Sequence, residues 1–372
     1  MDQPDPLKPG ATIGILGGGQ LGRMLAIAAA RLGYRAHVFS PDPKSPAFDL
    51  AAAHTVAEFE DTEALSAFAE TVDVITFEFE NVDVGALDRI AAQTPVHPPP
   101  SAVAIAQDRL VEKTFIRDAG AQTAPFTGVG SAEDIAQSLD EVGGTGILKT
   151  RRFGYDGKGQ SRVHTADDRE AAWNEIGGQP AILEGIVPFD FEISVVIARG
   201  QTGTVKAYTP VKNEHRDSIL HKTIAPADLS QSLRDKAQSV ATKLVEDLKY
   251  VGVLGAEMFV VGDEILVNEI APRVHNSGHW TLDGAATDQF EQHIRAITGL
   301  SLGDPSMIVA RAEMTNLIGA DVDNVSRWLS HMASRIYLYG KTEARPGRKM
   351  GHVTTVNRLA LPLDRLAQIH GE

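Results

Sequence analysis

Short apolar runs separated by polar turns divide the first hundred residues of the chain. Residues 11–16 (ATIGIL) lead into the glycine cluster of residues 17–22, and the apolar helical stretch RMLAIAAARLG follows it. Two further strands, expected at residues 35–39 and 72–79, end in polar turns and are separated by helical segments. Strands that alternate with helices in this way are typical of a parallel sheet, so we expect an α/β fold at this end of the chain.

A proline-rich segment separates this region from a longer one of mixed strands and helices. Residues 94–101 (TPVHPPPS) contain four prolines, too many for a helix or an inner strand, so we place a domain boundary there. The patterns that follow predict helices at residues 104–119 and 229–248, and strands at residues 146–150, 181–186, 192–198, 204–210, 253–261, 265–270, 335–339 and 350–356. The expected fold class is α/β at the start of the chain and α+β overall.

The composition excludes several classes of protein. The chain has 35 basic and 49 acidic side chains, and its formal net charge of -14 argues against a nucleic-acid-binding protein. No apolar run approaches the roughly 18 residues that cross a bilayer, and the first residues lack the pattern of a signal peptide. Because there is no cysteine, disulfides, thiolate nucleophiles and cysteine-ligated metal centres are excluded. We therefore expect a cytoplasmic enzyme with neither a nucleic-acid nor a membrane partner.

The first glycine cluster is a candidate phosphate site. Gly17, Gly19 and Gly22 form the pattern GxGxxG between a predicted strand and a predicted helix, where backbone amides can hold a phosphate group. A dinucleotide site also needs an acid after the second strand, and Asp42, at about that distance, falls in a proline-bounded turn. A nicotinamide or flavin site is therefore less favoured than a purely structural turn. A different phosphorylated or amine-bearing ligand is favoured over both.

A second glycine-rich loop, residues 154–160, is the most informative segment of the chain. It carries Lys158 and follows Lys149, so its amides and two ammonium groups could surround a polyphosphate. It is not a Walker A loop, because Gly159 stands where a serine or threonine would bind magnesium. The alternative is an ordinary solvated hairpin loop.

Two glutamates point to a metal site. If residues 262–264 form a three-residue hairpin loop, Glu257 and Glu269 lie opposite each other on one face of the hairpin. That face would otherwise carry the apolar side chains of Phe259, Val261, Ile265 and Val267. Paired carboxylates in an apolar setting make sense with a cation between them, and oxygen ligands without His or Cys indicate magnesium that bridges phosphate oxygens. The alternative is a pair of exposed strand carboxylates.

Two further polar clusters follow the hairpin. Residues 271–279 (APRVHNSGH) come directly after it and concentrate hydrogen-bond donors suited to a small planar anion. Residues 341–349 (KTEARPGRK) form a locally basic loop in an acidic chain. A solvated loop is the usual interpretation of such a basic cluster, and a phosphate site is the alternative.

In this order the motifs resemble those of the ATP-grasp superfamily and, within it, the 5-(carboxyamino)imidazole ribonucleotide synthases. The resemblance covers nearly the whole chain. Its landmarks are residues 14–24 (GILGGGQLGRM), 77–82 (FEFENV), 107–109 (QDR), 149–160 (KTRRFGYDGKGQ), 184–195 (EGIVPFDFEISV), 213–220 (NEHRDSIL), 268–279 (NEIAPRVHNSGH) and 347–353 (GRKMGHV).

The resemblance implies an ATP-grasp fold in three parts. These are an N-terminal Rossmann-like domain over residues 1–100, a two-lobed ATP-grasp domain over residues 101–300 with a hinge near residues 184–187, and a small β-rich C-terminal domain over residues 301–372. The implied reaction is the ATP-dependent carboxylation of 5-aminoimidazole ribonucleotide with bicarbonate, through carboxyphosphate, in purine biosynthesis. ATP would be the co-substrate and Mg²⁺ the metal. The resemblance also implies a homodimer, with functional coupling to the downstream mutase left open.

The same resemblance assigns roles to individual residues. The ATP site comprises Arg109, Lys149, Gly154, Tyr155, Asp156, Gly157, Lys158, Gly159, Gln160, Glu184, Gly185, Ile186, Val187, Glu192, His215, Asn268 and Glu269. The magnesium ligands are Glu257 and Glu269. The catalytic residues are Lys149, Arg273, His275 and Asn276, of which the last three hold bicarbonate and carboxyphosphate. The ribonucleotide lies against Gln20, Leu21, Glu78 and Asn276, with its 5′-phosphate at Lys341, Arg348 and Lys349.

Three alternatives stay open at this point. Another ATP-grasp ligase is the nearest: a formate-dependent glycinamide ribonucleotide transformylase would have glutamate in place of Gln20, and a biotin carboxylase would need a biotinylated carrier. A nicotinamide-dependent oxidoreductase would leave Glu257, Glu269 and the loop of residues 154–160 without a role. A non-catalytic module would bind ATP and magnesium without turning over a small substrate.

Overall fold

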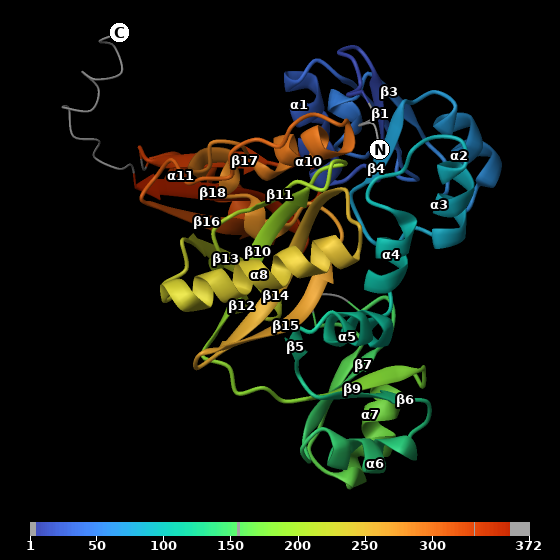
Figure 1. Ribbon diagram of the computed structural model, residues 1–372, viewed down its shortest axis with the longest axis vertical. Coiled ribbons are helices and arrows are strands. Elements are labelled where there is room, and N and C mark those ends of the chain that lie inside the picture. The colour runs from blue at the N-terminus through green and yellow to red at the C-terminus, as the bar shows by residue number, and fades with distance from the viewer. Residues whose placement is uncertain (1–4, 155–156, 331, 358–372) are drawn as a thin grey trace.

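The computed structural model describes residues 5–154, 157–330 and 332–357 (Figure 1). Within these residues the strands form three sheets, one at each end of the elongated molecule and one between them. No helix in the described residues is both long and apolar enough to cross a membrane.

The first sheet is parallel throughout, with the strand order β3-β2-β1-β4. Its strands are β1 (Thr12–Leu16), β2 (Arg35–Phe39), β3 (Ala53–Thr55) and β4 (Val74–Phe77). The helices are α1 (Gln20–Arg31), α2 (Thr62–Ala69) and α3 (Val84–Ala91), with a 3₁₀ turn at Phe48–Leu50. Successive strand residues face opposite sides of a sheet, so Ile13 and Ile15 pack with α1 while Phe39 packs with α2 and α3. The predicted α/β opening is confirmed.

A small antiparallel sheet lies at the opposite end of the molecule, at the bottom of Figure 1, with the order β6-β9-β7-β8. Its strands are β6 (Phe126–Val129), β7 (Gly146–Thr150), β8 (Gln160–Val163) and β9 (Ala181–Gly185). Helices α6 (Asp134–Glu141) and α7 (Arg169–Glu175) and the 3₁₀ turn Ala166–Asp168 cover it. The described residues of the glycine-rich loop, 154 and 157–160, lie between β7 and β8 or at the start of β8, so the loop belongs to this lobe.

The large sheet has the order β17-β18-β16-β13-β12-β10-β14-β15-β5, and β11 pairs with β10 outside this path. Its strands are β5 (Gln122–Thr123), β10 (Phe191–Arg199), β11 (Val205–Ala207), β12 (Val211–Arg216), β13 (Ile219–Ala225), β14 (Gly252–Val261), β15 (Glu264–Ala271), β16 (Arg311–Ile318), β17 (Ser334–Leu338) and β18 (Lys349–Asn357). Strands from beyond residue 301 therefore extend the sheet that carries the paired glutamates.

Helices on both faces of the large sheet supply its core. Helix α8 (Gln231–Asp247) crosses one face, and its buried residues Leu233, Ala237, Ala241 and Leu244 recur at helical spacing. Its first turn is capped by the Ser230 hydroxyl, which accepts from the Leu233 amide at 3.2 Å. The remaining elements near this sheet are α9 (Thr281–Gly284), α10 (Gln289–Ile297), α11 (Val325–Leu329) and 3₁₀ turns at Asn276–Gly278 and Gly319–Asn324. Helix α8 covers the face of the large sheet that points away from the cavity. The polar side chains of the opposite face are therefore available to line the cavity.

The helix expected at residues 104–119 is two helices, α4 (Pro100–Ala106) and α5 (Arg109–Asp118). Asp108 lies between them with an extended backbone, and its carboxylate accepts from the Leu110 amide at 3.1 Å, which caps α5. Next to it, the Gln107 side-chain amide donates to the carbonyls of Glu80 and Val82, at 2.6 Å each. The break lets Gln107 tie the first sheet to the helices that lead into the lobe.

The hairpin of β14 and β15 pairs Glu257 with Glu269 as predicted, but its loop length and register differ from those we expected. Val261 pairs with Glu264, so the loop is two residues, Gly262 and Asp263, rather than the three that we expected. The register then shifts between Glu257 and Met258, where Asn268 is an extra residue, and Glu257 faces Glu269 as predicted.

The register change corrects the predicted surroundings of the two glutamates. Ile265 and Val267 pair with Val260 and Met258 and join the buried cluster under α8, so they do not share the face of Glu257. The bulge instead places Asn268 beside Glu269 on the wall of the cavity. Bulges re-aim side chains in this way next to functional sites.

Candidate active site

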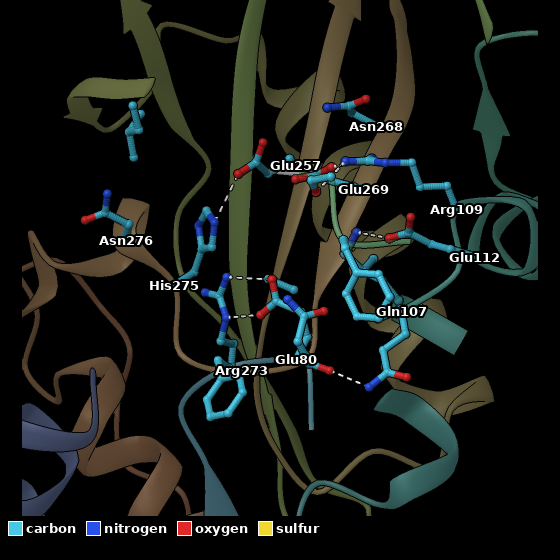
Figure 2. A pocket seen from close by; sticks show the side chains of 18 of the residues that line it. Glu80, Gln107, Arg109, Glu112, Glu257, Asn268, Glu269, Arg273, His275 and Asn276 are labelled. Atoms are coloured by element: carbon cyan, nitrogen blue, oxygen red, sulfur yellow. Dashed lines mark hydrogen bonds and ion pairs between the residues drawn. The ribbon is translucent and has the colours of Figure 1, made fainter. Parts of the chain in front are cut away.

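A cavity of about 710 Å³ lies where the loops of the first sheet, the small lobe and the large sheet meet (Figure 2). The predicted site residues that line it are Gln20, Leu21, Glu78, Arg109, Lys149, Gly154, Gly157, Gln160, Glu192, His215, Glu257, Asn268, Glu269, Arg273, His275, Asn276 and Lys349. The lining also includes residues that the sequence did not single out as site residues: Glu80, Gln107, Glu112, Arg151, Phe153 and Ser218.

Other predicted site residues lie outside this lining. In the described part of the chain these are Lys158, Gly159, Glu184, Gly185, Ile186, Val187, Lys341 and Arg348. Tyr155 and Asp156 fall outside the described residues. The carbonyl of Gly159 accepts from the Thr150 amide at 2.8 Å, so that glycine closes the turn between β7 and β8.

The two opposed glutamates each have a cationic or hydrogen-bonding partner. Glu257 Oε1 lies 3.0 Å from His275 Nε2, and Glu269 Oε2 accepts from Arg109 Nη1 at 3.0 Å. Burial alone would raise the pKa of Glu257, but the contact with His275 outweighs it and holds the value at about 2. The expectation that these carboxylates require a cation between them is therefore too strong, although one oxygen of each is left for a metal.

A buried carboxylate on β9 forms ion pairs with two lysines. Glu184 Oε2 lies 3.2 Å from Lys113 Nζ, and Oε1 lies 3.1 Å from Lys149 Nζ. Burial would raise the pKa of Glu184, but the charges of Lys113 and Lys149 hold it at about 2. Burial likewise lowers the pKa of Lys149, against the pull of Glu184. Glu184 thus fixes the ammonium of Lys149 on the cavity wall, and Lys113 is a partner that the sequence analysis missed.

Helix α5 places a carboxyl group that the sequence did not predict next to the paired glutamates. Glu112 is buried, and its Oε1 accepts from the Ile270 amide at 2.6 Å, directly after Glu269 (Figure 2). Burial, reinforced by the charge of Glu269, raises the pKa of Glu112 to about 8. The hydrogen bond from the Ile270 amide to Glu112 holds the bulged strand in place. Arg109, one turn earlier on α5, also donates to the Gly154 carbonyl at 3.3 Å and so links the helix to the loop.

The first glycine cluster is occupied by the protein's own carboxylate. Glu78 accepts from the Gly19 amide and, at 2.7 Å, from the Gly22 amide. A Cβ atom on Gly19 would lie 2.6 Å from Glu78 Oε1, which explains why glycine is needed there. Burial raises the pKa of Glu78, although these amides and Lys341 oppose the change. The amides that would bind a dinucleotide pyrophosphate are already used, which argues against the nicotinamide interpretation.

Arg273 is held by a carboxylate that comes from the first sheet. Its Nε donates to Glu80 Oε2 at 2.6 Å and its Nη2 to Glu80 Oε1 at 3.3 Å (Figure 2). Burial would lower the pKa of Arg273, but Glu80 raises it, and Arg273 in turn lowers the pKa of Glu80 against the effect of burial. The guanidinium is thus fixed at the cavity in a bidentate pair, and Gln107 holds the backbone that carries Glu80.

His275 and Asn276 follow on the same loop. A Cβ atom on Gly255 would lie 2.7 Å from His275 Cβ, so the glycine in β14 makes room for the histidine. Its ring reaches Glu257 through Nε2 and Ser277 through Nδ1, the latter at 2.7 Å. Both amide atoms of Asn276 are buried on the cavity side and have no hydrogen-bond partner among the described residues. Buried amides are rarely left unpaired, so Asn276 is suited to a polar ligand.

On β10 and β12 a histidine and a glutamate form a third polar pair. His215 Nδ1 lies 2.5 Å from Glu192 Oε2, and both residues line the cavity. Burial would lower the pKa of His215, but Glu192 raises it above the ordinary value.

The basic loop contributes Lys349 to the cavity. Lys341 donates to the Lys349 carbonyl at 2.8 Å, and Arg348 donates to the Glu343 carbonyl at 3.1 Å. Burial, with the charges of Arg348 and Lys349 added, lowers the pKa of Lys341 to about 8. Lys341 therefore supports the position of Lys349 from behind the lining.

These groups form one site with separate regions. One region has positive charge that suits a polyphosphate, from the glycine amides, Arg109 and Lys149. The opposed carboxylates of Glu257 and Glu269 line the same cavity and offer hard oxygen ligands to a metal. Donors on residues 273–276 lie beside the carboxylates, and Gln20, Leu21 and Lys349 line the part formed by the first and C-terminal regions. Such an arrangement suits a phosphoryl transfer to a small acceptor beside a second bound substrate.

Three family models match the chain in turn. Residues 10–107 match the ribonucleotide synthetase preATP-grasp domain, residues 114–290 the ATP-grasp domain, and residues 312–360 the phosphoribosylaminoimidazole carboxylase C-terminal domain. The chain is also 49% identical to the N5-carboxyaminoimidazole ribonucleotide synthase of Brucella melitensis, over 94% of this chain and 97% of that protein.

Solved structures agree in fold over the same length. The crystal structure of an ADP complex of an N5-carboxyaminoimidazole ribonucleotide synthetase matches with a TM-score of 0.92 and 38% identity, covering 100% of this chain and 98% of that chain. The Aspergillus clavatus synthase in complex with ADP and 5-aminoimidazole ribonucleotide matches with a TM-score of 0.88 and 32% identity, covering 97% of each chain.

Proposed function

The chain belongs to the N5-carboxyaminoimidazole ribonucleotide synthase family, and we propose that it catalyses the reaction named by that family. It carboxylates 5-aminoimidazole ribonucleotide with bicarbonate at the expense of ATP, and forms N5-carboxyaminoimidazole ribonucleotide, ADP and phosphate. The observation that carries the proposal is the single cavity that combines Lys149, the opposed Glu257 and Glu269, and the unpaired amide of Asn276.

The chemistry proceeds in two stages. A bicarbonate oxygen attacks the γ-phosphorus of ATP, the bond to the bridging oxygen of ADP breaks, and carboxyphosphate forms. Its C–O bond to phosphorus-bound oxygen then breaks, which releases phosphate and carbon dioxide. The exocyclic amine of the ribonucleotide adds to this carbon dioxide and loses a proton, which leaves a carboxylated nitrogen.

The residues act by position and charge. Lys149 and Arg109 stabilise the charge that moves onto the leaving phosphate oxygens, and Glu184 keeps Lys149 in place. Arg273, fixed by Glu80, and the amide of Asn276 orient the planar bicarbonate next to the terminal phosphate. The ribonucleotide lies against Gln20, Leu21 and Glu78. Its 5′-phosphate points toward Lys349, and Lys341 and Arg348 add positive charge around that phosphate.

The other residues of the proposed site hold the nucleotide. His275 holds Glu257, and the pair of Glu192 and His215 borders the nucleotide. Asn268 and the glycines of residues 154–160 line the phosphate region, and the backbone of residues 184–187 carries the adenine.

The carboxylates fit a magnesium ion. Among the described residues no group of three or more His, Cys, Asp or Glu side chains could hold a metal alone. Mg²⁺ commonly takes only one or two protein carboxylates and completes its shell with phosphate oxygens and water, so Glu257 and Glu269 are a suitable pair. When bound there, the ion would neutralise phosphate charge.

We also propose the wider setting of the enzyme. It acts in the cytoplasm as a homodimer, and its product serves the mutase that follows. Its parts are residues 1–100, 101–300 and 301–372, a division supported by three successive family matches.

Omission of single substrates tests the function. Purified protein with ATP and Mg²⁺ should release ADP rapidly only when 5-aminoimidazole ribonucleotide is present, and should incorporate labelled bicarbonate into the ribonucleotide. Release that instead needs formate and glycinamide ribonucleotide would contradict the substrate assignment and leave an ATP-grasp ligase. ATP binding without any turnover would contradict catalysis itself.

A further inference from the structure

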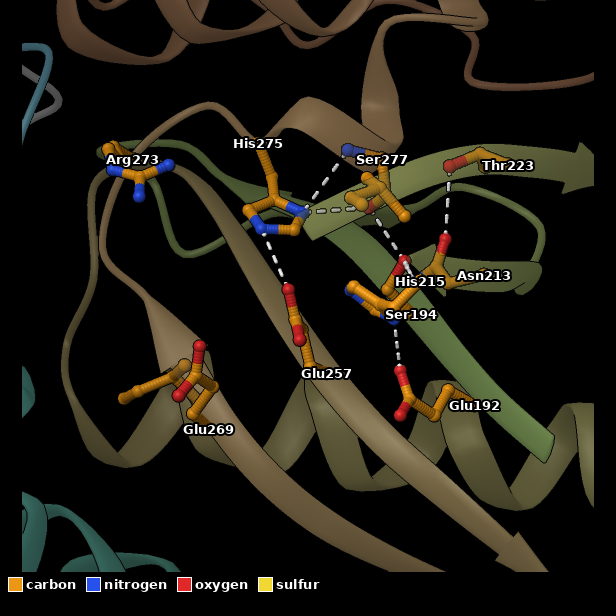
Figure 3. Close-up of polar contacts among 12 residues, drawn as sticks. Glu192, Ser194, Asn213, His215, Thr223, Glu257, Glu269, Arg273, His275 and Ser277 are labelled. Carbon is orange, nitrogen blue, oxygen red and sulfur yellow. Dashed lines mark hydrogen bonds and ion pairs between the residues drawn. The ribbon is translucent and has the colours of Figure 1, made fainter. Parts of the chain in front are cut away.

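A row of buried polar side chains runs through the large sheet behind His275, where the proposed reaction gives it no task (Figure 3). Thr223 lies on β13, Asn213 on β12, Ser194 on β10 and Ser277 in the 3₁₀ turn after His275. Thr223, Ser194 and Ser277 are 0% exposed and Asn213 is 5% exposed. None of the four lines the cavity.

Hydrogen bonds connect the row without a gap. The Thr223 hydroxyl donates to Asn213 Oδ1 at 3.0 Å, and Asn213 Nδ2 donates to Ser194 Oγ at 3.0 Å. The Ser194 hydroxyl donates to Ser277 Oγ at 2.6 Å, and Ser277 Oγ lies 2.7 Å from His275 Nδ1. The row therefore ends on the nitrogen of His275 that faces away from Glu257.

Two groups with fixed roles define the hydrogen bonds of the His275 ring, the backbone amide of Ser277 and the carboxylate of Glu257. The Ser277 hydroxyl accepts from Ser194 with one lone pair and has its own hydrogen to donate to His275 Nδ1. The Ser277 backbone amide also points at Nδ1, at 3.4 Å. The backbone amide can only donate, so in the neutral ring Nδ1 offers its lone pair to it and the ring hydrogen lies on Nε2. There it is donated to Glu257 Oε1, 3.0 Å away, and a carboxylate can only accept.

An apolar row of the same shape would fill the sheet without the desolvation cost of four buried polar groups. Packing alone therefore gives no reason for the row. Its effect is at its end, where the Ser277 hydroxyl contacts His275 Nδ1 and, as a donor, favours the ring hydrogen on Nε2. Such partners of a ligand-holding histidine fix its tautomer and its orientation.

We propose that Ser277, Ser194 and Asn213 are positioning residues that set the hydrogen of His275 on Nε2 and aim it at Glu257. The bond occupies Oε1 of Glu257 and turns Oε2 toward the nucleotide. The inference about the tautomer stands on the hydrogen bonds, whereas its consequence for turnover rests on the proposed function.

Glu257 also favours a hydrogen on Nε2, so the test must remove that influence. In Glu257→Gln the side-chain amide can either accept from Nε2–H or donate to an Nε2 lone pair, and it imposes no tautomer. Nitrogen-15 NMR of protein labelled at histidine reads the tautomer directly, without substrate or metal. The loss of the His275 signals in His275→Gln assigns them.

With the row intact, Glu257→Gln should keep the hydrogen on Nε2. Adding Ser194→Ala should move the two nitrogen signals of His275 toward each other, because the Ser277 hydroxyl, no longer oriented by Ser194, can rotate its hydrogen away from Nδ1 and accept from Nδ1–H. Ser138→Ala, a matched change at a buried serine of α6, should leave both signals in place on the same background. A hydrogen on Nδ1 in the unmodified protein, or signals in Glu257→Gln that do not respond to Ser194→Ala, would overturn the proposal.

Steady-state kinetics of Ser194 variants distinguish a positioning role of this residue from a purely structural one. Ser194→Ala should lower kcat by about tenfold and leave the Michaelis constant for the ribonucleotide unchanged, as is usual for groups that support a metal ligand. Ser194→Thr, which keeps the hydroxyl, should recover most of the loss. If the protein shows the predicted tautomer but does not carboxylate the ribonucleotide, the proposed function is refuted. The proposal that the row positions His275 would still stand. Normal kcat in Ser194→Ala would refute the catalytic consequence.

Discussion

Replacing Glu184 tests whether this buried carboxylate stabilises the protein by holding the ammonium groups of Lys113 and Lys149. Lys113 is 0% exposed, and Glu184 retains 5% of its side-chain exposure. The pKa of Glu184 is about 2 against an ordinary 4.5, a difference of 2.5. Since each pKa unit corresponds to about 1.4 kcal/mol, the ionised form of this carboxylate is favoured by a net amount of about 3 kcal/mol after the opposing effect of burial. Glu184→Gln should therefore lower the free energy of unfolding by about 3–5 kcal/mol, because two buried ammonium groups lose their counter-charge.

The same interaction has a defined pH dependence. Because the folded pKa lies below the unfolded one, the stabilisation is complete above about pH 4.5 and is lost as the pH falls toward 2. Urea unfolding at several pH values measures it as the difference between the unmodified protein and Glu184→Gln. That difference should be largest at neutral pH and should shrink below pH 4.5.

Two further variants make the test specific. Glu264→Gln removes a carboxylate from an exposed pair with Lys236, and no measurable change in stability is expected. Adding Lys113→Met to Glu184→Gln should restore part of the lost stability, because it removes one of the two stranded charges. The reasoning is refuted if Glu184→Gln is as stable as the unmodified protein, or if its effect is the same at every pH.

Other predictions concern the metal and the ribonucleotide. Glu269→Gln should lower magnesium-dependent ADP formation by about 100- to 1,000-fold with an unchanged circular dichroism spectrum, and near-normal turnover would remove it as a ligand. Arg348→Ala should raise the Michaelis constant for the ribonucleotide by about tenfold; a change confined to ATP would contradict the phosphate assignment. The pKa of Lys341 is about 8, so kcat/KM for the ribonucleotide should fall above that pH as the ammonium is lost. Lys341→Arg should remove this fall, and an identical profile in that variant would exclude Lys341 as its source.

The parallel sheet could be predicted because local pattern decides it. β1 and β2 are short apolar runs bounded by turns, and they lie where the sequence placed them. The facing of Glu257 and Glu269 was also predicted, but from a three-residue loop that does not exist. A two-residue loop and a bulge at Asn268 give the same pairing, and a bulge leaves no clear signal in a single sequence.

The partners behind the cavity were missed for a different reason. Arg109, Glu112 and Lys113 occupy positions i, i+3 and i+4 of one helix face, a spacing visible in the sequence. Charged helix faces are usually solvated, and only tertiary packing shows that Glu112 and Lys113 are buried. The pairing of Arg273 with Glu80 likewise joins two loops that follow strands of different sheets, and no local pattern encodes it.

The most direct test of the central claim follows oxygen from bicarbonate. If carboxyphosphate forms, one bicarbonate oxygen ends in the released phosphate. Turnover of ATP with ¹⁸O-labelled bicarbonate and 5-aminoimidazole ribonucleotide should therefore give phosphate that carries one labelled oxygen, detected by mass spectrometry, together with a carboxylated ribonucleotide. Unlabelled phosphate from an active preparation would show that bicarbonate is not the phosphoryl acceptor and would contradict the account.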